Sequence, residues 1–140
     1  MMINPYINFN GNTEEAFNFY KSVFGGEFSN FQRFKDTPQG SEMSAEDGKK
    51  VMHVALMIGK NALMGSDFTE SMGGKFVAGT NFSISLMAES KEEADRLFNA
   101  LSAGGIVEMP LADTFWGAYF GMWKDKFGVA WMINYDYPKN

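Results

Sequence analysis

The stretch NTEEAFNFYKSVFGGEF, residues Asn12 to Phe28, returns in altered form as SKEEADRLFNALSAGGIV, residues Ser90 to Val107. The two copies align with a shift of 78 positions. In both, apolar residues recur every three or four positions, which predicts two amphipathic helices of similar length. These residues are Ala16, Tyr20, Val23 and Phe24 in the first copy, and Ala94, Leu97, Phe98 and Leu101 in the second.

Both copies also carry the signals that begin and end a helix. Asn12 and Ser90 suit the N-cap position, and Glu15 and Glu93 lie where a capping box needs them. A pair of glycines follows each helix, and glycine readily adopts the left-handed conformation that ends one. The doubled set of signals therefore indicates an internal repeat.

Strand-like segments surround each helix in the same order. One precedes the helix, at residues 3–9 or 80–87, and three follow it. The three are residues 27–34, 50–59 and 61–66 in the first half, and 106–112, 116–123 and 129–134 in the second. The turn KDKFG at residues 124–128 has hairpin chemistry, with aspartate early and glycine late. Each half is therefore predicted to have the element order β-α-β-β-β.

We expect one α+β domain over residues 1–140, made of module 1 (residues 1–66) and module 2 (residues 80–140). The segment 67–79 joins the modules, and its three glycines favour flexibility. The last strands of the two modules align with a shift of 68, because residues 35–50 are longer than their counterpart. Residues 35–50 and 67–80 are long polar loops, and the sequence leaves open whether they act as lids.

Composition excludes several classes of protein. The net charge is −5 and no cluster of Lys and Arg occurs, so we expect neither a nucleic-acid surface nor a basic membrane-binding helix. No apolar run approaches the ~20 residues of a membrane-spanning helix, and the N-terminus lacks a signal-peptide pattern. The absence of cysteine excludes disulfides and thiol nucleophiles, and it favours the reducing cytoplasm.

Two βαβββ units in one short chain resemble the vicinal oxygen chelate superfamily, which contains glyoxalase I, bleomycin-resistance proteins and extradiol dioxygenases. The stretches INPYINFNGN (residues 3–12), TFWGAYFG (residues 114–121) and DKFGVAWMIN (residues 125–134) resemble its PhnB-like branch. The resemblance implies a curved, mostly antiparallel sheet around a cavity, and a homodimer with composite pockets. Some members of the branch carry a demethylubiquinone methyltransferase label, but we find no glycine-rich strand-to-helix turn for a methyl-donor nucleotide.

The resemblance also directs attention to four possible metal-ligand positions. Metal-using members of the superfamily hold a divalent cation with His or carboxylate side chains on the first and last strands of each unit. The internal repeat carries these positions onto Pro5, Met64, Ser83 and Met132. None of the four suits a hard or borderline cation. We therefore expect no metal site of the superfamily's kind and no cofactor, while a divalent metal held by other residues stays open.

A few isolated polar residues are candidates for chemistry. His53 is the only histidine, and it is either a general base or pocket hydrogen-bonder, or a strand histidine satisfied by a neighbour, which we favour. Arg33 either pairs with an anionic ligand or forms a surface salt bridge. The carboxylates Asp67, Glu108 and Asp113 are expected at solvated loop or edge positions.

The segment 113–134 is unusually aromatic, with seven rings in 22 residues against 16% over the whole chain. Alternation along a strand divides residues 116–123 into two faces. With the family resemblance, we assign the rings to a pocket wall (Trp116, Phe120), to a contact face (Tyr119, Trp123) and to the core (Phe127, Trp131). Gly117 and Gly121 flank Tyr119, so we expect a helix or a partner subunit to approach the sheet there.

The first strands complete the expected site. If Pro5 and Ser83 face the cavity, Ile7, Phe9 and Ser85 share that side with them. The candidate ligand-binding residues are therefore Ile7, Phe9, Arg33, Ser83, Ser85, Trp116, Phe120 and Met132. They predict a mainly apolar cavity with a few hydroxyls.

We expect a PhnB-like protein that binds a small apolar or aromatic molecule without a metal. The alternative is a metal-dependent lyase, isomerase or dioxygenase whose unusual ligands include His53. The residues leave open whether the chain is an enzyme. Its expected partners are a second copy of itself and a small-molecule ligand.

Overall fold

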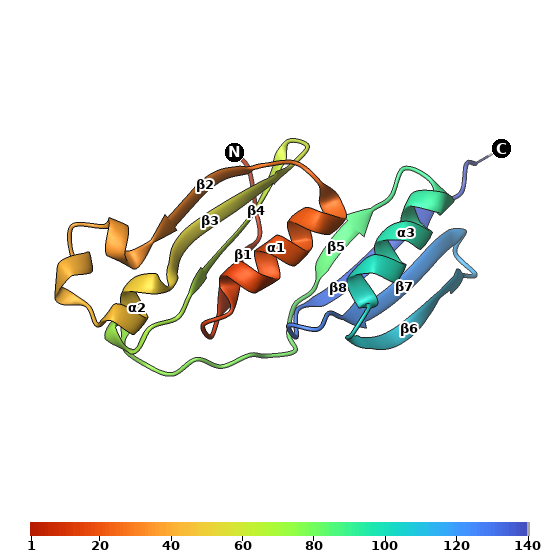
Figure 1. The fold of residues 1–140 in the computed structure, drawn as a ribbon. Helices are drawn as coiled ribbons and strands as arrows, with labels where there is room; N and C mark the ends of the chain where they lie inside the picture. The colour runs from red at the N-terminus through yellow and green to blue at the C-terminus, as the bar shows by residue number, and fades with distance from the viewer. Residues whose placement is uncertain (140) are drawn as a thin grey trace. The chain divides into compact units, whose positions relative to one another are not determined.

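The computed structural model describes residues 1–139. The chain forms two compact units, Met1–Val77 and a second that begins at Ala78 (Figure 1). The elements of the first unit are β1 (Tyr6–Phe9), α1 (Thr13–Phe24), β2 (Phe28–Arg33), η1 (Phe34–Asp36), η2 (Gly40–Glu42), α2 (Ala45–Lys49), β3 (Val51–Ile58), β4 (Asn61–Asp67) and η3 (Glu70–Met72). Those of the second are β5 (Ile84–Met87), α3 (Lys91–Ser102), β6 (Ile106–Asp113), β7 (Ala118–Lys124) and β8 (Ala130–Asp136).

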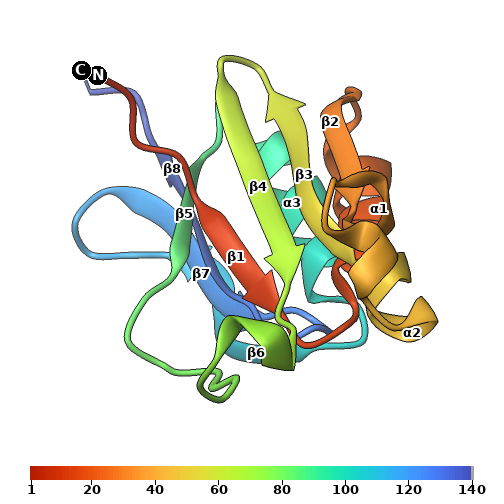
Figure 2. The ribbon, with the colours of Figure 1, turned by 90° about the vertical axis from the view of Figure 1, so that its left-hand side faces the viewer.

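Each unit contains a four-stranded sheet of the same topology. The strand orders are β1-β4-β3-β2 and β5-β8-β7-β6. In each sheet the first strand runs parallel to the last, and the other pairs are antiparallel. Figure 2 shows β1, β4 and β3 side by side in the first unit. The predicted α+β fold and the repeated β-α-β-β-β order are confirmed, with α2 as an addition within the long segment 35–50.

In the first unit, α1 packs on one face of the sheet. Phe17 and Tyr20 are fully buried, and Phe17 meets the ring of Phe9 edge to face at 6.1 Å. Gly65 of β4 admits this contact, because a Cβ there would lie 2.7 Å from Phe17 Cε1. The core of the first unit therefore lies between α1 and β1, β3 and β4.

In the second unit, α3 packs on the sheet through Phe98, whose ring meets Trp123 at 5.2 Å. Gly121 makes room for Phe98, since a Cβ on it would lie 2.9 Å from Phe98 Cε2. The bulky neighbour expected at Gly117 and Gly121 is thus a helix of the same unit at Gly121, whereas at Gly117 no atom lies within 4 Å of an added Cβ, which corrects that half of the prediction. Trp123 stacks on Trp131 at 6.4 Å, and both are buried, which confirms Trp131 as core.

Phe127 is not core. It lies half-exposed in the turn between β7 and β8, where the Lys126 ammonium sits 5.4 Å from its ring centroid. Asp125 organises this turn as predicted, since one of its oxygens accepts from the backbone amides of Phe127 and Val129 at 2.9 and 3.0 Å. Its other oxygen accepts from Trp131 Nε1 at 2.9 Å, so the turn residue also fixes a core indole.

The two helix starts differ. Ser90 caps α3 as predicted, because its hydroxyl accepts from the Glu93 amide at 3.0 Å. Asn12 makes no side-chain cap on α1, which corrects that prediction. The carboxylate of Asp67 accepts from the Thr13 amide at 3.0 Å and from the Thr13 hydroxyl at 2.6 Å instead. Asp67 is only 2% exposed, so its expected solvated position is also wrong.

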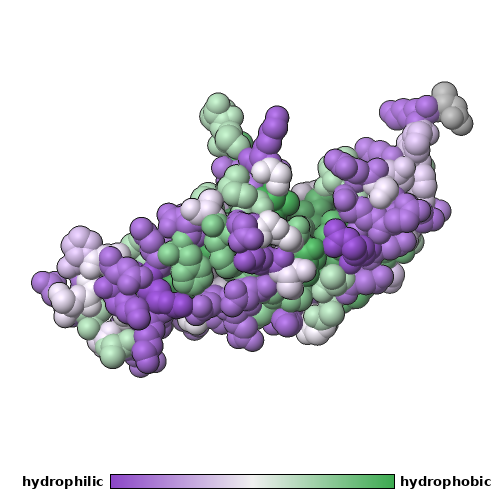
Figure 3. All heavy atoms as spheres, turned by 45° about the horizontal axis from the view of Figure 1, so that its top comes forward, coloured by the Kyte–Doolittle hydropathy of each residue, from purple (hydrophilic) through white to green (hydrophobic). Residues whose placement is uncertain are grey.

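Across the described residues, no helix combines the length and the apolar character that crossing a membrane requires. Apolar side chains nevertheless remain exposed among the polar ones, as Figure 3 shows for the face that it presents.

Candidate functional site

Each sheet has one face against its own helix and one face that this helix does not cover. In the second unit, Trp123, Trp131 and Ile133 point to the helix side and are buried. Because side chains alternate along a strand, the residues between them point the other way. We call this the open face of the second sheet, and it carries Ser85, Met87, Phe120, Met122, Met132 and Asn134.

A chain of three aromatic rings lies at one end of this face. Trp116 meets Phe120 at 6.1 Å and Phe115 at 5.0 Å, both edge to face. Trp116 is 56% exposed and Phe115 97% exposed. Trp116 lies in the turn before β7 rather than in the strand. The structure therefore brings Trp116 and Phe120 together, as assigned, and adds Phe115, which the sequence left unplaced.

The other candidates of the second unit lie on or near the same face. Ser85 is exposed and stands directly opposite Met132 in the pairing of β5 with β8. Ser83 is exposed just before β5. Asn134 adds an amide, which donates to Asp136 Oδ1 at 2.8 Å and to Met87 Sδ at 3.5 Å. The face is thus apolar with a few hydroxyl and amide groups.

Ile7 and Phe9 do not belong to such a face, which corrects the assignment from the sequence. They are 7% and 3% exposed and lie on the side that α1 covers. The physical reason is the register of the parallel pairs. Tyr6 stands opposite Met64, whereas Ser85 stands opposite Met132. The first strands therefore align with a shift of 79 rather than 78, and one position exchanges the two faces.

The open face of the first sheet holds Tyr6 and His53 instead. The Tyr6 hydroxyl and His53 Nδ1 share a hydrogen bond of 3.1 Å, and their rings stack at 5.6 Å. Next to Tyr6 on the same face, Asn8 Oδ1 accepts from the Ser66 hydroxyl at 3.2 Å. His53 is thus satisfied by a neighbour, the interpretation that the sequence favours. Sequence reasoning did not identify Tyr6 as the partner of His53, because tyrosine is a common residue in β-strands.

Arg33 forms a salt bridge, which is one of the two roles that the sequence left open for it. Its guanidinium donates to both carboxylate oxygens of Glu14, at 3.1 and 2.7 Å, and to the Lys49 carbonyl at 2.9 Å. The hydrogen bond from Arg33 lowers the pKa of Glu14, and the same bond raises the pKa of Arg33. This pair lines a cavity of about 370 Å³ together with Asn10, Lys50 and Asp67.

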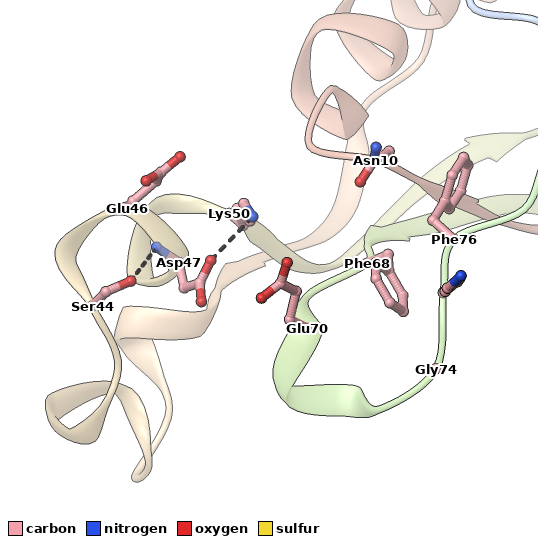
Figure 4. A pocket seen from close by; sticks show the side chains of 10 residues that line it. Asn10, Ser44, Glu46, Asp47, Lys50, Phe68, Glu70, Gly74 and Phe76 are labelled. Atoms are coloured by element: carbon pink, nitrogen blue, oxygen red, sulfur yellow. Dashed lines mark hydrogen bonds and ion pairs between the residues drawn. The ribbon is translucent and has the colours of Figure 1, made fainter.

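A second open cavity of the first unit, of about 540 Å³, lies between the two long loops (Figure 4). One wall carries Phe68 and Phe76, whose rings meet at 6.3 Å. The rest of the lining is polar or charged, including Glu70 and the ion pair of Lys50 with Asp47 at 3.0 Å. Lys50 keeps its proton more firmly because its hydrogen bond to Asp47 raises its pKa. Both cavities differ from the apolar one expected from the sequence.

Ionisable groups also gather on the helix side of the second unit. Tyr119 donates to Asp95 Oδ1 at 2.6 Å, and this bond with burial raises the pKa of Tyr119 to about 12. Tyr137 donates to Asp113, a bond that raises the Tyr137 pKa. The Lys91 ammonium lies 4.7 Å from the Tyr119 ring centroid. These partners satisfy one another, and they make Tyr119 a contact residue of α3, consistent with its assignment to a contact face.

A cluster that could hold a hard metal ion is missing from the described part of the chain. Among residues 1–139, no three His, Cys, Asp or Glu side chains lie together in a suitable group. The positions that the resemblance singled out do not supply one, because Met64 and Met132 offer thioethers and Ser83 an exposed hydroxyl.

Comparison with known proteins agrees with this architecture. Protein YjdN of Escherichia coli (strain K12) is 33% identical over 139 residues, covering 96% of this chain and 95% of that protein. The crystal structure of protein PA1353 from Pseudomonas aeruginosa is similar with a TM-score of 0.83 and 46% identity, over 97% of this chain and 98% of that one. The PhnB protein from Bacillus cereus, described as a putative 3-demethylubiquinone-9 3-methyltransferase, has a TM-score of 0.77 and 27% identity, over 96% and 99% of the two chains.

A more distant structure shares the fold alone. A glyoxalase/bleomycin resistance protein/dioxygenase family enzyme from Burkholderia phytofirmans shares the fold, with a TM-score of 0.61 and 20% identity over 94% and 97% of the two chains. The two βαβββ units of this chain thus have the glyoxalase-like fold that the sequence predicted. Within this class, the chain belongs to the PhnB-like family described as 3-demethylubiquinone-9 3-methyltransferase, which it matches over residues 1–134.

Proposed function

We propose that this PhnB-like protein binds a small, partly aromatic molecule on the open face of its second sheet, without a divalent metal. One observation carries the proposal, namely the ring chain of Phe115, Trp116 and Phe120, in which the first two rings are exposed and the third is half-buried. Large aromatic side chains bury well over 100 Å² when they are covered, so two adjacent exposed rings beside a half-buried third mark a contact surface. Flat apolar ligands stack favourably on such rings.

Polar groups beside the rings would orient the ligand. Ser85 and Asn134 lie on the same face, on neighbouring strands, and both carry hydrogen-bonding groups. Met132 stands opposite Ser85, and Met122 of β7 stands opposite Met132, so both supply adaptable apolar contacts on the same face. A mostly apolar surface with a few placed polar groups is typical of small-molecule sites.

The alternative function, metal-dependent catalysis at His53, has less support. Tyr6 is the hydrogen-bonding partner of His53, and no group of three potential hard-metal ligands occurs among residues 1–139. The methyltransferase description belongs to the family and to its relative from Bacillus cereus. Here each sheet has a single parallel strand pair, which differs from the parallel sheet of dinucleotide-type folds.

We also propose a homodimer that works in the cytoplasm. The second unit exposes several large apolar side chains in addition to the aromatic chain, and these are Phe82, Met87, Ile106, Val107 and Met109. Three of them, Ile106, Val107 and Met109, lie along the edge strand β6, and an exposed apolar edge favours coverage by a partner. The absence of cysteine agrees with a reducing compartment.

A thermal-shift screen of small aromatic metabolites tests the binding proposal. A ligand of the native state raises the melting temperature by mass action. We expect the response to the best compound to be lost in Trp116→Ala and Phe120→Ala. Phe82→Ala is the matched control, because Phe82 is 60% exposed but makes no contact with the ring chain in the described structure. Equal responses in Trp116→Ala and in the unaltered protein would contradict the proposal.

A further inference from the structure

Three methionines form a row across the second sheet. Met109 of β6 stands directly opposite Met122 of β7, and Met122 stands directly opposite Met132 of β8. Directly opposed residues of antiparallel strands point to the same face, with their Cβ atoms about 4.5–5.5 Å apart. The row lies on the open face, because Trp123 next to Met122 points to α3. We call these residues the methionine row.

The three sulfur atoms can meet at one point. Met122 is the middle member, so the Cβ atoms of Met109 and Met132 are each about 5 Å from that of Met122. Methionine has three rotatable side-chain bonds, which lets the outer thioethers swing toward the middle one. Met109 is 44% exposed, and Met122 and Met132 are half-buried, so solvent reaches the row in the folded protein.

The row is not explained as ordinary core packing. The core positions of the same strands hold Trp123, Trp131 and Ile133, with exposures of 0%, 1% and 0%. The methionines occupy the opposite face, so their side chains do not pack against α3. Three thioethers at paired positions on three adjacent strands instead make a ligand set for a soft metal ion, with the pairing of β6 and β7 irregular on either side of Met109.

We propose that the methionine row binds a soft monovalent cation, of which Cu(I) is the biological example. Thioether sulfur is a soft ligand that selects Cu(I) over hard cations. The chain has no cysteine to compete for such an ion, and residues 1–139 hold no cluster of His, Asp and Glu that would favour a divalent one. The two proposed sites share Met122 and Met132, but this one needs the sulfur atoms and not the aromatic rings, so the two can be tested separately.

The test is a titration of the full chain with Cu(I) under anaerobic, reducing conditions, against a chromophoric Cu(I) chelator. Ag(I) serves in parallel as a probe that undergoes no redox change. We expect one equivalent of either ion to bind. Met122→Leu, which nearly conserves volume, should weaken the affinity at least tenfold, and the triple change to leucine at Met109, Met122 and Met132 should abolish binding. Zn(II) should not compete.

Matched variants make the outcome decisive. Met57→Leu alters a methionine of β3 that is 37% exposed, and Met72→Leu one in η3 that is 54% exposed, so both should leave the affinity unchanged. Unfolding curves verify that each leucine variant folds. The proposal would be overturned if the unaltered protein bound no Cu(I), or if Met122→Leu kept its affinity for Cu(I). It would also be overturned if Cu(I) binding were lost only when Met1 and Met2 were changed. Retained Cu(I) binding in Trp116→Ala would separate this site from the small-molecule site.

Discussion

At the scale of single residues, two buried carboxylates hold the backbone in place. Asp67 accepts hydrogen bonds from Thr13 and, at 2.8 Å, from the amide of Val51. It therefore joins the start of α1, the start of β3 and the end of β4. In the last hairpin, Asp125 accepts hydrogen bonds from the amide of Val129 and from the indole of Trp131, so it holds the turn to the start of β8. A buried donor or acceptor without a partner costs free energy. Both carboxylates therefore contribute more to the free energy of unfolding than a carboxylate on the surface does.

Replacing Asp67 tests this directly. Asp67→Ala leaves two buried backbone amides and one hydroxyl without their acceptor, so we expect the free energy of unfolding to fall by about 3 kcal/mol. Urea unfolding monitored by circular dichroism measures it. Glu70→Gln, at an exposed position three residues further on, should change stability by less than about 0.5 kcal/mol. Equal effects in the two variants would show that Asp67 is not a structural anchor.

The pair of Glu14 and Arg33 should make stability depend on pH in the acid range. The hydrogen bond from Arg33 lowers the pKa of Glu14 below its usual 4.5, so the carboxylate is stabilised in the folded protein. The contribution is complete above pH 4.5 and is lost as the pH falls through the lower folded value. Because Glu14 is partly exposed, we expect the pair to contribute less than about 1 kcal/mol to the free energy of unfolding. Glu14→Gln should remove this component from the pH profile of unfolding, while Glu15→Gln should keep it.

At the scale of elements, helix-on-sheet packing could be predicted well and the sheet faces only in part. Apolar spacing predicted both helices and Gly121 predicted a close approach, because both are local signals. The cap of α1 could not be predicted, because its acceptor, Asp67, lies 54 positions along the chain. The face of Ile7 and Phe9 could not be predicted either, because the register of β1 with β4 depends on pairing rather than on the repeat.

Adding one methyl group to Gly121 tests the packing of α3. The new Cβ would meet the Phe98 ring at 2.9 Å and Leu111 Cα at 3.2 Å, so either the helix or the strand must shift. We expect Gly121→Ala to cost about 1–3 kcal/mol in thermal or urea unfolding. The control is Gly79→Ala, where the nearest atom to a new Cβ is Asn81 Oδ1 at 3.4 Å. A neutral Gly121→Ala variant would mean that α3 does not pack this closely.

At the scale of the whole molecule, the two units share a topology but differ in surface. The open face of the first sheet holds Tyr6 and His53, and the cavities of about 370 and 540 Å³ in this unit are mainly polar. The second unit exposes the adjacent rings of Phe115 and Trp116, whereas exposed methionines occur in both units. A duplicated sequence could predict the common topology, whereas the difference in character arises from individual side chains. Trp116 and Phe120 lie next to each other, as expected, whereas Ile7 and Phe9 lie on the helix side of the first sheet.

The exposed apolar side chains of the second unit predict self-association. We expect sedimentation velocity to give a species of about twice 15.7 kDa. Ile106→Glu places a charge on an edge strand at a residue that is 66% exposed, and it should shift the protein toward the monomer. Val77→Glu, at an 81% exposed position of the first unit, should not. A single species of 15.7 kDa in the unaltered protein would refute the homodimer.

The central claim is that the open face of the second sheet is the ligand-binding surface. The most direct measurement is the methyl spectrum of protein labelled with ¹³C-methyl methionine, titrated with the strongest compound from the thermal-shift screen. We predict that the signals of Met122 and Met132 shift in proportion to occupancy, while that of Met52 in the first unit stays in place. Shifts confined to methionines of the first unit, or no compound that shifts any methionine, would contradict the claim.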